Sequence, residues 1–438
     1  MASGISKISL FPVTSGVNDS GHLVIGGCDC VVLGEEFGTP LYVFDEVGLR
    51  RKCAEFRAEF SQRYADTTVI YASKAFASKA LALIFKEEGL GLDVVSGGEM
   101  GIARAVDFPM DRVYFHGNNK SAEELDQAVA WQVGRIVVDN SHELAMLNEI
   151  AGGHKRIVDI LLRLSPGVDP HTHQYNTTGI VDSKFGFTLS LWEEAVAQAM
   201  SAPNLNLIGL HFHLGSLIFE AEPYQEAIGI VLSFAAEMKR KHGLELKELN
   251  IGGGFAIQYT LNASSPPVSF YAEVIASVIV DKCRELGLLL PRLVIEPGRS
   301  IVGQSAVALY KVGVVKDIPG VRCYVSVDGG MGDNIRPALY GAAQEAVAAN
   351  KMREDDRIMV TVAGKFCESG DILIRDLNLP LVSVGDLVAV AGCGAYCLPL
   401  ASNYNATVRP AVVLVKEGKA RLIRRRESLE DLTRCDLI

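Results

Sequence analysis

Short apolar runs alternate with amphipathic stretches of helical length from about residue 40 to about residue 300. A strand followed by a helix, repeated about eight times, predicts a parallel sheet, because each helix carries the chain back to the same edge. A (β/α)8 TIM-like barrel is the favoured arrangement, and a doubly wound sheet is the alternative. The expected strands are "PLYVF" (40–44), "TVIYAS" (68–73), "GLDVVS" (91–96), "RVYFHG" (112–117), "RIVVDN" (135–140), "DILLRLS" (159–165), "LIGLHFH" (207–213), "LKELNIGGG" (246–254) and "LVIEPG" (293–298).

Three of the expected helices begin with a serine followed three residues later by a glutamate. This spacing is typical of a capping box, in which the two side chains satisfy the first backbone N–H groups of the helix. The pairs are Ser96 with Glu99, Ser121 with Glu124, and Ser190 with Glu193.

The pattern changes after about residue 305. Segments such as "SAVALYKVGVVKDI" (305–318) and "RIMVTVAGK" (357–365) are β-rich and separated by turn signals, which predicts a mostly antiparallel β-sandwich or barrel. The N-terminal piece "HLVIGGCDCVVL" (22–33) resembles these segments. We therefore expect a barrel domain over residues 38–305 and a β domain made of residues 1–37 and 306–438.

Composition narrows the possible partners. Of the 438 residues, 49% are apolar and 21% are charged, which is ordinary for a globular chain. The formal net charge of −10 argues against nucleic acid as a partner, which needs a basic surface. No apolar run is long enough for a membrane span and no signal-like segment opens the chain, so we expect a cytoplasmic protein with no membrane partner. The nine cysteines lack zinc spacing, and no metal is expected.

Lys74 follows the run "TVIYAS" directly. Function collects at the carboxyl ends of the strands in a barrel, where partial burial can free a lysine amine for Schiff-base chemistry. Lys79 falls within the next helix and is expected to be solvated. A lysine at a strand end is nevertheless more often structural or paired with an anion, so Lys74 alone decides nothing.

Three further motifs end strands. In "HFHLGS" (211–216), His213 can stack on a flat ring or bind a metal, although a buried histidine pair is the simpler interpretation. The glycines of "GGG" (252–254) allow close approach of an anion, and "VIEPGRS" (294–300) brings Glu296 to the barrel mouth. Together they supply an amine, a ring stacker, a phosphate cradle and a carboxylate, a set that suits pyridoxal 5′-phosphate better than a metal.

These residues carry a resemblance to a known family. The chain resembles the alanine-racemase-like, pyridoxal-phosphate-dependent decarboxylases, which have a cofactor-binding barrel and a β domain. The resemblance covers nearly the whole chain. It rests on "YASKA" (71–75), "HFHLGS" (211–216), "GGG" (252–254), "EPGR" (296–299), "DGGMGDNIRPALYG" (328–341), "CESGD" (367–371), "GAYC" (394–397) and "SNYN" (402–405).

The resemblance implies a role for each matching residue. Lys74 would be joined to the cofactor, His213 would stack on its ring, and Glu296 would face the ring nitrogen. The phosphate would be held by Ser216, Gly254 and the backbone of Glu296, Pro297, Gly298 and Arg299. Cys367 would donate a proton. The substrate would be bound by Arg299, Arg336, Tyr340, Glu368 and Tyr396, of which Tyr396 also touches the cofactor.

The implied reaction is decarboxylation of meso-2,6-diaminopimelate to L-lysine and CO2, the last step of lysine biosynthesis. In the family, the loop carrying Cys367 and Glu368 comes from the other subunit, which implies a homodimer with shared active sites. Three alternatives stay open at this stage: a related decarboxylase acting on ornithine, lysine or carboxyspermidine, a non-catalytic homologue, and a metal hydrolase that uses His211 and His213.

Overall fold

The computed structural model describes residues 3–169 and 183–438. Contacts between Cα atoms divide the chain into two compact units. The barrel unit comprises Cys53–Ala256 and Ser265–Gly298, and the β unit comprises Met1–Lys52, Ile257–Ser264 and Arg299–Ile438. Each unit is described by itself below.

The barrel unit is built on eight parallel strands that close in the order β10-β11-β12-β5-β6-β7-β8-β9, which confirms the predicted barrel and rules out the doubly wound sheet. The strands are β5 (Thr67–Ala72), β6 (Gly91–Val94), β7 (Val113–Phe115), β8 (Arg135–Val138), β9 (Val158–Arg163), β10 (Leu205–His211), β11 (Glu248–Asn250) and β12 (Arg292–Ile295).

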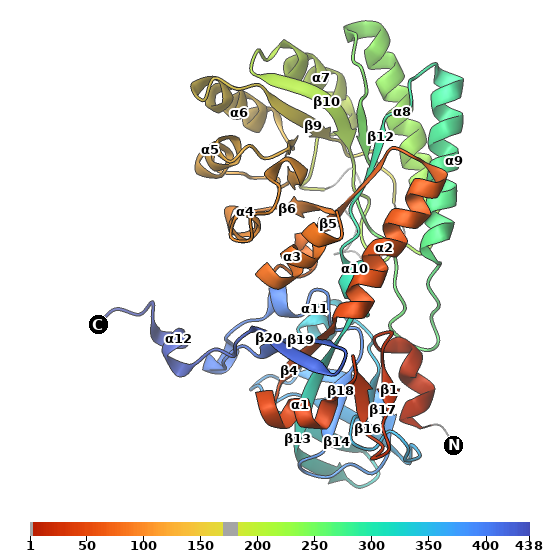
Figure 1. Ribbon diagram of the computed structural model, residues 1–438, viewed down its shortest axis with the longest axis vertical. Coiled ribbons are helices and arrows are strands. Elements are labelled where there is room, and N and C mark those ends of the chain that lie inside the picture. Colours follow the sequence, from red (N-terminus) through yellow and green to blue (C-terminus); the bar gives the residue numbers. More distant parts are fainter. Residues whose placement is uncertain (1–2, 170–182) are drawn as a thin grey trace. The chain divides into compact units, whose positions relative to one another are not determined.

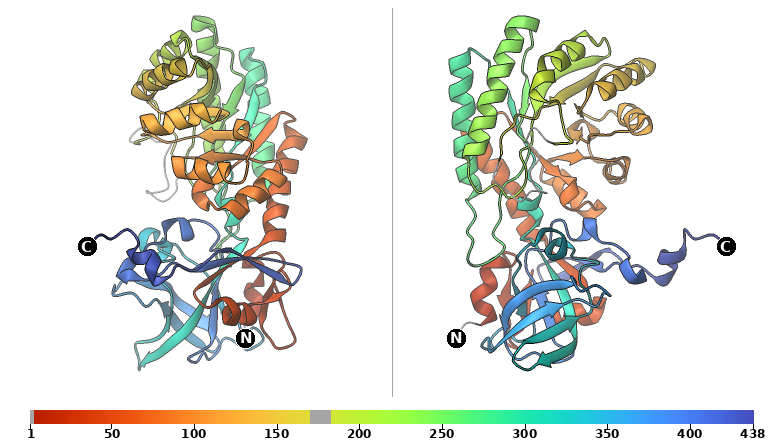
Figure 2. Two further views of the ribbon diagram at one scale, coloured as in Figure 1. Left: turned by 60° about the vertical axis from the view of Figure 1, so that its left-hand side comes forward. Right: turned by 180° about the vertical axis from the view of Figure 1, so that it is seen from behind.

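Helices cover the outside of the barrel (Figures 1 and 2). Each follows a strand and turns its apolar face inward, so that the strands are buried on both faces. The helices are α2 (Glu46–Arg63), α3 (Lys79–Glu87), α4 (Gly97–Arg104), α5 (Ala122–Ala130), α6 (Ser141–Gly153), α7 (Trp192–Ser201), α8 (Glu222–His242) and α9 (Val268–Leu286), with short 3-10 turns at Ser73–Ala75, Met110–Arg112 and Leu189–Leu191.

Two of the three predicted helix starts are confirmed. Ser96 caps α4 by accepting from the N–H of Glu99, and Ser121 forms a complete capping box on α5. The prediction for Ser190 is wrong, because α7 begins at Trp192 and its N-cap, Leu191, makes no side-chain bond. The buried indole of Trp192 donates to the Phe187 carbonyl, so tertiary packing fixes this helix start.

One buried side chain from each of six strands forms an apolar layer inside the barrel. This layer consists of Ile70, Tyr114, Val137, Leu161, Ile208 and Val294. Because side chains alternate along a strand, residues two places further on also face inward. Beyond four of the six layer residues, the side chain two places further on is polar and lies at the carboxyl end of the barrel: His116, Asp139, Arg163 and Glu296.

The β unit holds a nine-stranded sheet whose central path is β17-β16-β14-β13-β4-β19-β20, with β18 paired to β13 and to β15. Only β14 with β16 and β4 with β19 are parallel pairs in this sheet, which confirms the mostly antiparallel character. The strands are β4 (Leu41–Asp45), β13 (Ala306–Ile318), β14 (Arg322–Val327), β15 (Ala346–Ala348), β16 (Ile358–Ala363), β17 (Ile372–Leu379), β18 (Leu387–Val390), β19 (Ala411–Lys416) and β20 (Lys419–Arg424).

The run "PLYVF" does not belong to the barrel, contrary to the sequence analysis. It forms β4, which pairs with β13 and β19 in the β unit. The eight remaining runs supply the eight barrel strands. The N-terminal segment also lies in the β unit, where β1 (Gly16–Val17), β2 (Leu23–Ile25) and β3 (Cys28–Asp29) form a small sheet.

Short helices complete the β unit. They are the 3-10 turns Gly4–Leu10, Leu398–Leu400 and Tyr404–Ala406, and the helices α1 (Cys30–Phe37), α10 (Arg299–Val302), α11 (Arg336–Tyr340) and α12 (Leu429–Thr433). Residues from β2, β4, β13, β18 and β19 share one apolar core. Across both units, none of the helices in the described ranges has the length and apolar character needed to span a membrane.

Candidate active site

Polar side chains at the carboxyl ends of the barrel strands line a cavity of about 350 Å³. The spacing explains their place, because Glu296, His116 and Arg163 each follow a residue of the apolar layer by two positions. The cavity is lined by Lys74, Asp93, Val95, His116, Gly117, Asn118, Asn119, Arg163, Phe185, His211, His213 and Glu296. It lies wholly within the barrel unit.

Lys74 lies in the 3-10 turn directly after β5 and is half-buried in the cavity wall. Lys79 is exposed at the first position of α3. The two lysines are therefore separated as the sequence predicted, and only Lys74 can present its amine to a molecule in the cavity.

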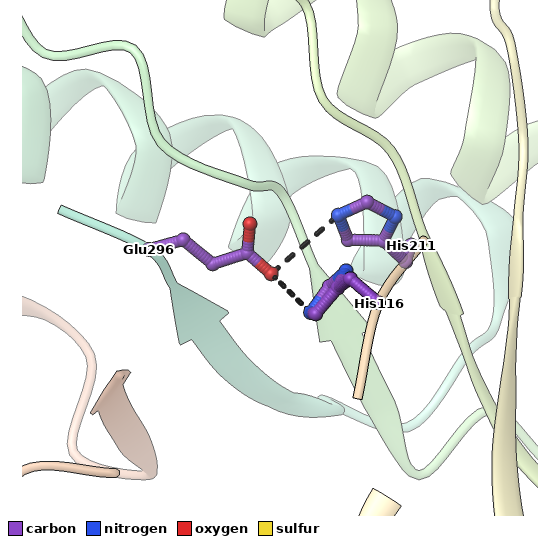
Figure 3. Close-up of side chains that lie close together, drawn as sticks. All are labelled: His116, His211 and Glu296. Atoms are coloured by element: carbon purple, nitrogen blue, oxygen red, sulfur yellow. Dashed lines mark ion pairs between the residues drawn. The ribbon is translucent and has the colours of Figure 1, made fainter. Parts of the chain in front are cut away.

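Glu296 is buried at the end of β12 and its Oε1 atom is the meeting point of three side chains. Asn250 donates to Oε1 at 2.7 Å, and Nε2 of His116 and Nε2 of His211 lie 3.1 and 3.5 Å from it. Figure 3 shows both imidazoles directed at the same carboxylate. Asn250 also accepts from the N–H of Gly252 at 3.0 Å, so one side chain joins the carboxylate to the glycine turn.

The two buried carboxyls at the cavity differ in electrostatic environment. Burial raises the pKa of Asp93, and the nearby Glu296 raises it further. Burial alone would also raise the pKa of Glu296, but His116 and His211 outweigh it and hold that pKa well below its usual range. Burial lowers the pKa of His211 to about 3, so its imidazole is neutral at physiological pH. The cavity therefore holds an ionised Glu296 beside a neutral His211.

His213 and the glycine turn form one wall. The N–H of Gly253 donates to Nδ1 of His213 at 3.1 Å, which leaves the hydrogen of a neutral ring on Nε2. Burial, and then the nearby Lys74, lower the pKa of His213 well below its usual value. A neutral imidazole fixed through one nitrogen is suited to stacking on a flat ring.

The loops that carry Ser216 and Gly254 lie side by side. The N–H of Ile218 donates to the Gly254 carbonyl at 2.9 Å. Gly254 has φ of +112°, and a Cβ there would lie 2.7 Å from the Gly215 carbonyl oxygen, so only glycine fits. The structure thus brings the two predicted phosphate-binding loops together.

The segment after β12 lies against the strand that leads to Lys74. The N–H of Ala72 donates to the Pro297 carbonyl at 3.3 Å. A Cβ at Gly298 would approach the Ala72 methyl group to 3.0 Å. The predicted residues Lys74, Pro297 and Gly298 are therefore neighbours at the barrel mouth.

In the β unit, a tyrosine that the sequence analysis did not select joins two of the predicted residues. Arg299 donates to the hydroxyl of Tyr259 at 3.0 Å, and the Arg336 guanidinium lies 4.3 Å from the centre of the Tyr259 ring. Arg299 also lies 4.5 Å from the centre of the Tyr396 ring. Tyr396 has φ of +59°, an uncommon conformation for a non-glycine residue and one often found at functional sites.

Cys367 and Glu368 are exposed on a loop before β17. The N–H of Cys367 donates to Oδ1 of Asn405 at 3.0 Å, and the hydroxyl of Tyr404 donates to its carbonyl at 3.3 Å. Tyr340 is half-buried at the end of α11, the helix that begins at Arg336.

The sequence analysis also missed Asp93, His116 and Arg163, which line the cavity beside Lys74. The sequence feature that could have identified them is the alternation of side chains along a strand. This alternation places all three side chains inside the barrel, near the carboxyl ends of their strands. His116 stands within the run "RVYFHG", which was assigned only a structural role.

A phosphorylated pyridine fits the residues that are present. His116 Nε2, both ring nitrogens of His211 and Asp93 Oδ1 are buried without a hydrogen bond of acceptable geometry. Buried polar atoms normally have partners, so these atoms indicate a polar ligand in the cavity. At the glycine turn an added Cβ would collide with backbone, and glycines in such turns let the backbone approach a phosphate closely.

A second interpretation of the cavity is a metal site. His116, His211 and Glu296 are the only group of three or more potential metal ligands that lie close together among the described residues. His213, which the metal-hydrolase alternative requires, is not in that group. Its Nδ1 is already occupied by the N–H of Gly253.

Comparisons with known proteins agree with the cofactor interpretation. Residues 47–303 match the family model described as pyridoxal-dependent decarboxylase, pyridoxal binding domain. The chain is 46% identical to diaminopimelate decarboxylase of Bacillus subtilis over 97% of each chain, and 44% identical to that of Synechocystis over 98% of this chain and 93% of the relative. The crystal structure of diaminopimelate decarboxylase from M. jannaschii in complex with L-lysine superposes with a TM-score of 0.91, at 34% identity over 97% of this chain and 98% of that one.

Proposed function

The chain belongs to the pyridoxal-dependent decarboxylases, and we propose that it converts meso-2,6-diaminopimelate to L-lysine and CO2 with pyridoxal 5′-phosphate as cofactor. This is the last step of lysine biosynthesis. The observation that carries the proposal is that Lys74 and an ionised Glu296 line one cavity beside a glycine turn. The substrate is taken from similar proteins of Bacillus subtilis, Halalkalibacterium halodurans and Synechocystis, which are named diaminopimelate decarboxylase and match nearly the full length of the chain.

Several of the predicted residues would hold the cofactor. Lys74 would provide the amine for attachment, His213 would stack on the ring, and Ser216, Gly254 and the backbone of 296–299 would bind the phosphate. Once bound, pyridoxal phosphate stabilises the negative charge that develops when a carboxyl group leaves the substrate. Glu296 makes that possible, because an adjacent negative charge keeps a pyridine nitrogen protonated.

The substrate's second amino-acid end needs its own partners. Arginine suits a carboxylate because its planar guanidinium binds both oxygens, and a glutamate suits an ammonium. Arg299 and Arg336, which both contact Tyr259, are proposed to bind the carboxylate. Tyr340 and Tyr396 are proposed to assist them. Glu368 is proposed to bind the distal ammonium. Ornithine has no distal carboxylate, so an arginine would lose its partner, and polar sites discriminate strongly against such substrates.

The final step returns a proton to the carbon that has lost CO2. Cys367 is proposed as the donor, because a thiol can transfer a proton over a short distance to a carbanion and its side chain is exposed on a loop. We expect Cys367→Ala protein to bind pyridoxal phosphate normally but to turn over slowly. Normal turnover by this variant would remove the assigned role.

A substrate panel tests the proposed function. The protein with pyridoxal phosphate added is given meso-diaminopimelate, L-lysine, L-ornithine or carboxyspermidine, and CO2 release and product identity are measured. We expect CO2 and L-lysine from diaminopimelate alone, and loss of the cofactor's protein-bound absorbance in Lys74→Ala. Faster turnover of ornithine would point to a related decarboxylase, and bound zinc in place of the cofactor would point to a metal enzyme.

The loop position of Cys367 and Glu368 suits an active site shared between two copies. We propose a homodimer in which each copy lends this loop to the other. Mixed dimers of Lys74→Ala and Cys367→Ala chains should then regain part of the activity, because one of their two sites carries both intact residues. Proven subunit exchange without recovered activity would contradict the sharing.

We also propose that the protein works in the cytoplasm. All nine cysteines are free thiols, the state that a reducing compartment maintains. Fractionation of cells that express the tagged chain would test this location.

A further inference from the structure

His116 is a buried imidazole that the proposed reaction does not yet use. It follows β7 directly and is 4% exposed. Its Nε2 atom lies 3.1 Å from Oε1 of Glu296 and 3.7 Å from Oδ1 of Asp93. The ring therefore stands between two buried carboxyl groups and closer to Glu296.

Two carboxyl groups in one buried cavity cannot both ionise cheaply, because like charges repel strongly there. Here their pKa values move in opposite directions, up for Asp93 and down for Glu296. Such a separation is typical of sites in which one carboxyl must stay ionised. The charged or titratable groups around Glu296 at the cavity are His116 after β7, His211 at the end of β10, His213 just beyond it, Arg163 at the end of β9, Asp93 in β6 and Lys74 after β5.

A simple packing role explains these contacts less well. An imidazole without a well-made hydrogen bond is costly to bury, and neither Nε2 of His116 nor the nitrogens of His211 has one. The two rings meet edge to face with their centres 4.9 Å apart, and both point at the same carboxylate (Figure 3). An apolar side chain would fill this space without that cost, so the nitrogen itself is the useful feature.

We propose that His116 is a positioning residue whose Nε2 holds the Glu296 carboxylate ionised and directed into the cavity. This inference rests on the proposed function, in which Glu296 is the partner of the cofactor's ring nitrogen. Asn250, on the adjacent strand β11, fixes the same oxygen through a neutral amide. His116 differs from Asn250 because it is the titratable group nearest to that oxygen. Its loss should change both the ionisation of the Glu296 carboxylate and the orientation of the Glu296 side chain.

The test compares His116→Leu, His116→Gln and the control His154→Leu. Glutamine keeps an N–H near the place of Nε2, whereas leucine removes it. His154 pairs with Asp126 on the surface of the same unit, so His154→Leu removes a histidine–carboxylate contact outside the cavity. Circular dichroism of the cofactor-free proteins checks that each variant is folded.

The first measurement does not depend on the cofactor. Selective ¹³C labelling of glutamate, with the Glu296 signal assigned by its absence in Glu296→Gln, follows the pKa of that carboxyl in cofactor-free protein. We expect His116→Leu to raise it by at least about one unit, since one unit corresponds to a tenfold change in equilibrium. His116→Gln should raise it less, and His154→Leu should leave it unchanged. An unchanged pKa in folded His116→Leu overturns the inference.

The second measurement uses the loaded enzyme. Titration with pyridoxal phosphate should show about 10-fold weaker binding in His116→Leu, because the expected rise of one unit in the pKa of Glu296 corresponds to a tenfold change in equilibrium. The acidic limb of the kcat/KM profile should move to higher pH, because the pKa of Glu296 rises, and His116→Gln should partly restore both. Wild-type affinity with an unmoved limb in His116→Leu contradicts the inference, whereas a wild-type chain that binds no cofactor contradicts the proposed function instead.

Discussion

Lys120 should be one of the most costly residues of the barrel unit to replace. Its ammonium is buried and uses all three N–H groups, donating to Oε1 of Glu143 at 2.7 Å, to the Val137 carbonyl at 2.8 Å and to the Gly117 carbonyl at 2.9 Å. The second carboxylate oxygen of Glu143 accepts from the N–H of Asp139 at 3.1 Å. The pair therefore holds the segment between β7 and α5, part of which lines the cavity, against β8 and α6.

Lys120→Met removes one charge and leaves the other buried. Each hydrogen bond from a charged donor contributes about 1.5–3 kcal/mol, and methionine regains part of this by apolar burial. Removing one partner of a buried ion pair typically costs about 3–5 kcal/mol, and we expect a loss of that size in the free energy of unfolding. Urea denaturation followed by far-ultraviolet circular dichroism measures it.

Two further variants show whether the buried charge is the cause. In Lys120→Met with Glu143→Leu no charge is left unpaired, so the double variant should be more stable than the single one, with a remaining deficit from the two unsatisfied carbonyls. Lys241→Met is the matched control, because Lys241 pairs with Glu193 at 2.8 Å on the surface. A loss below about 1 kcal/mol for Lys120→Met, the range of surface pairs, would refute the reasoning. So would a double variant less stable than the single one.

Three other substitutions test the site. Gly254→Ala should cost about 1–3 kcal/mol of stability and weaken cofactor binding, because φ is positive there and the added Cβ would lie 2.7 Å from the Gly215 carbonyl oxygen. Denaturation measures the stability, and cofactor titration measures the binding. Glu296→Gln should bind the cofactor more weakly and, when saturated with it, show a kcat about 10²- to 10³-fold lower, since a neutral amide cannot hold the ring nitrogen protonated; an unchanged kcat contradicts this role. Tyr259→Phe should raise KM for diaminopimelate about 2- to 10-fold at constant kcat, because it removes only the hydrogen bond to Arg299; equal losses in kcat would assign Tyr259 to the chemistry instead.

The alternation of apolar and polar residues was sufficient to predict the barrel, because the eight runs from residue 68 onward are buried on both faces and separated by amphipathic helices. The same reasoning failed for "PLYVF". All five residues of β4 are buried, as in a barrel strand, but its partners are β13 and β19. The sequence of a strand that is buried on both faces does not indicate which sheet the strand joins. Its sheet could therefore be identified only from the strand pairing in the structure.

Lys74 was selected as a site residue because several motifs at strand ends, and the family that they resemble, point to the same cofactor, although the lysine alone decided nothing. Site residues were missed where the role depends on a neighbour from another strand. His116 becomes significant only when closure of the barrel brings β7 and β12 together at Glu296. Tyr259 becomes significant only when it meets Arg299 and Arg336, which are 40 and 77 residues further along the chain by their numbers. Neither contact follows from local periodicity.

Asn250 explains why the glycine turn must follow β11 directly. Its buried amide donates to Glu296 and accepts from Gly252, two residues on. A Cβ at Gly253 would lie 2.1 Å from the Glu296 carbonyl oxygen, so the turn packs directly on the end of β12. The proposed phosphate cradle and the proposed partner of the ring nitrogen are therefore held by the same few atoms. A cofactor that is bound through its phosphate and its ring nitrogen needs a fixed distance between the two binding groups. This rigid connection sets that distance before the cofactor binds, so less conformational entropy is lost on binding.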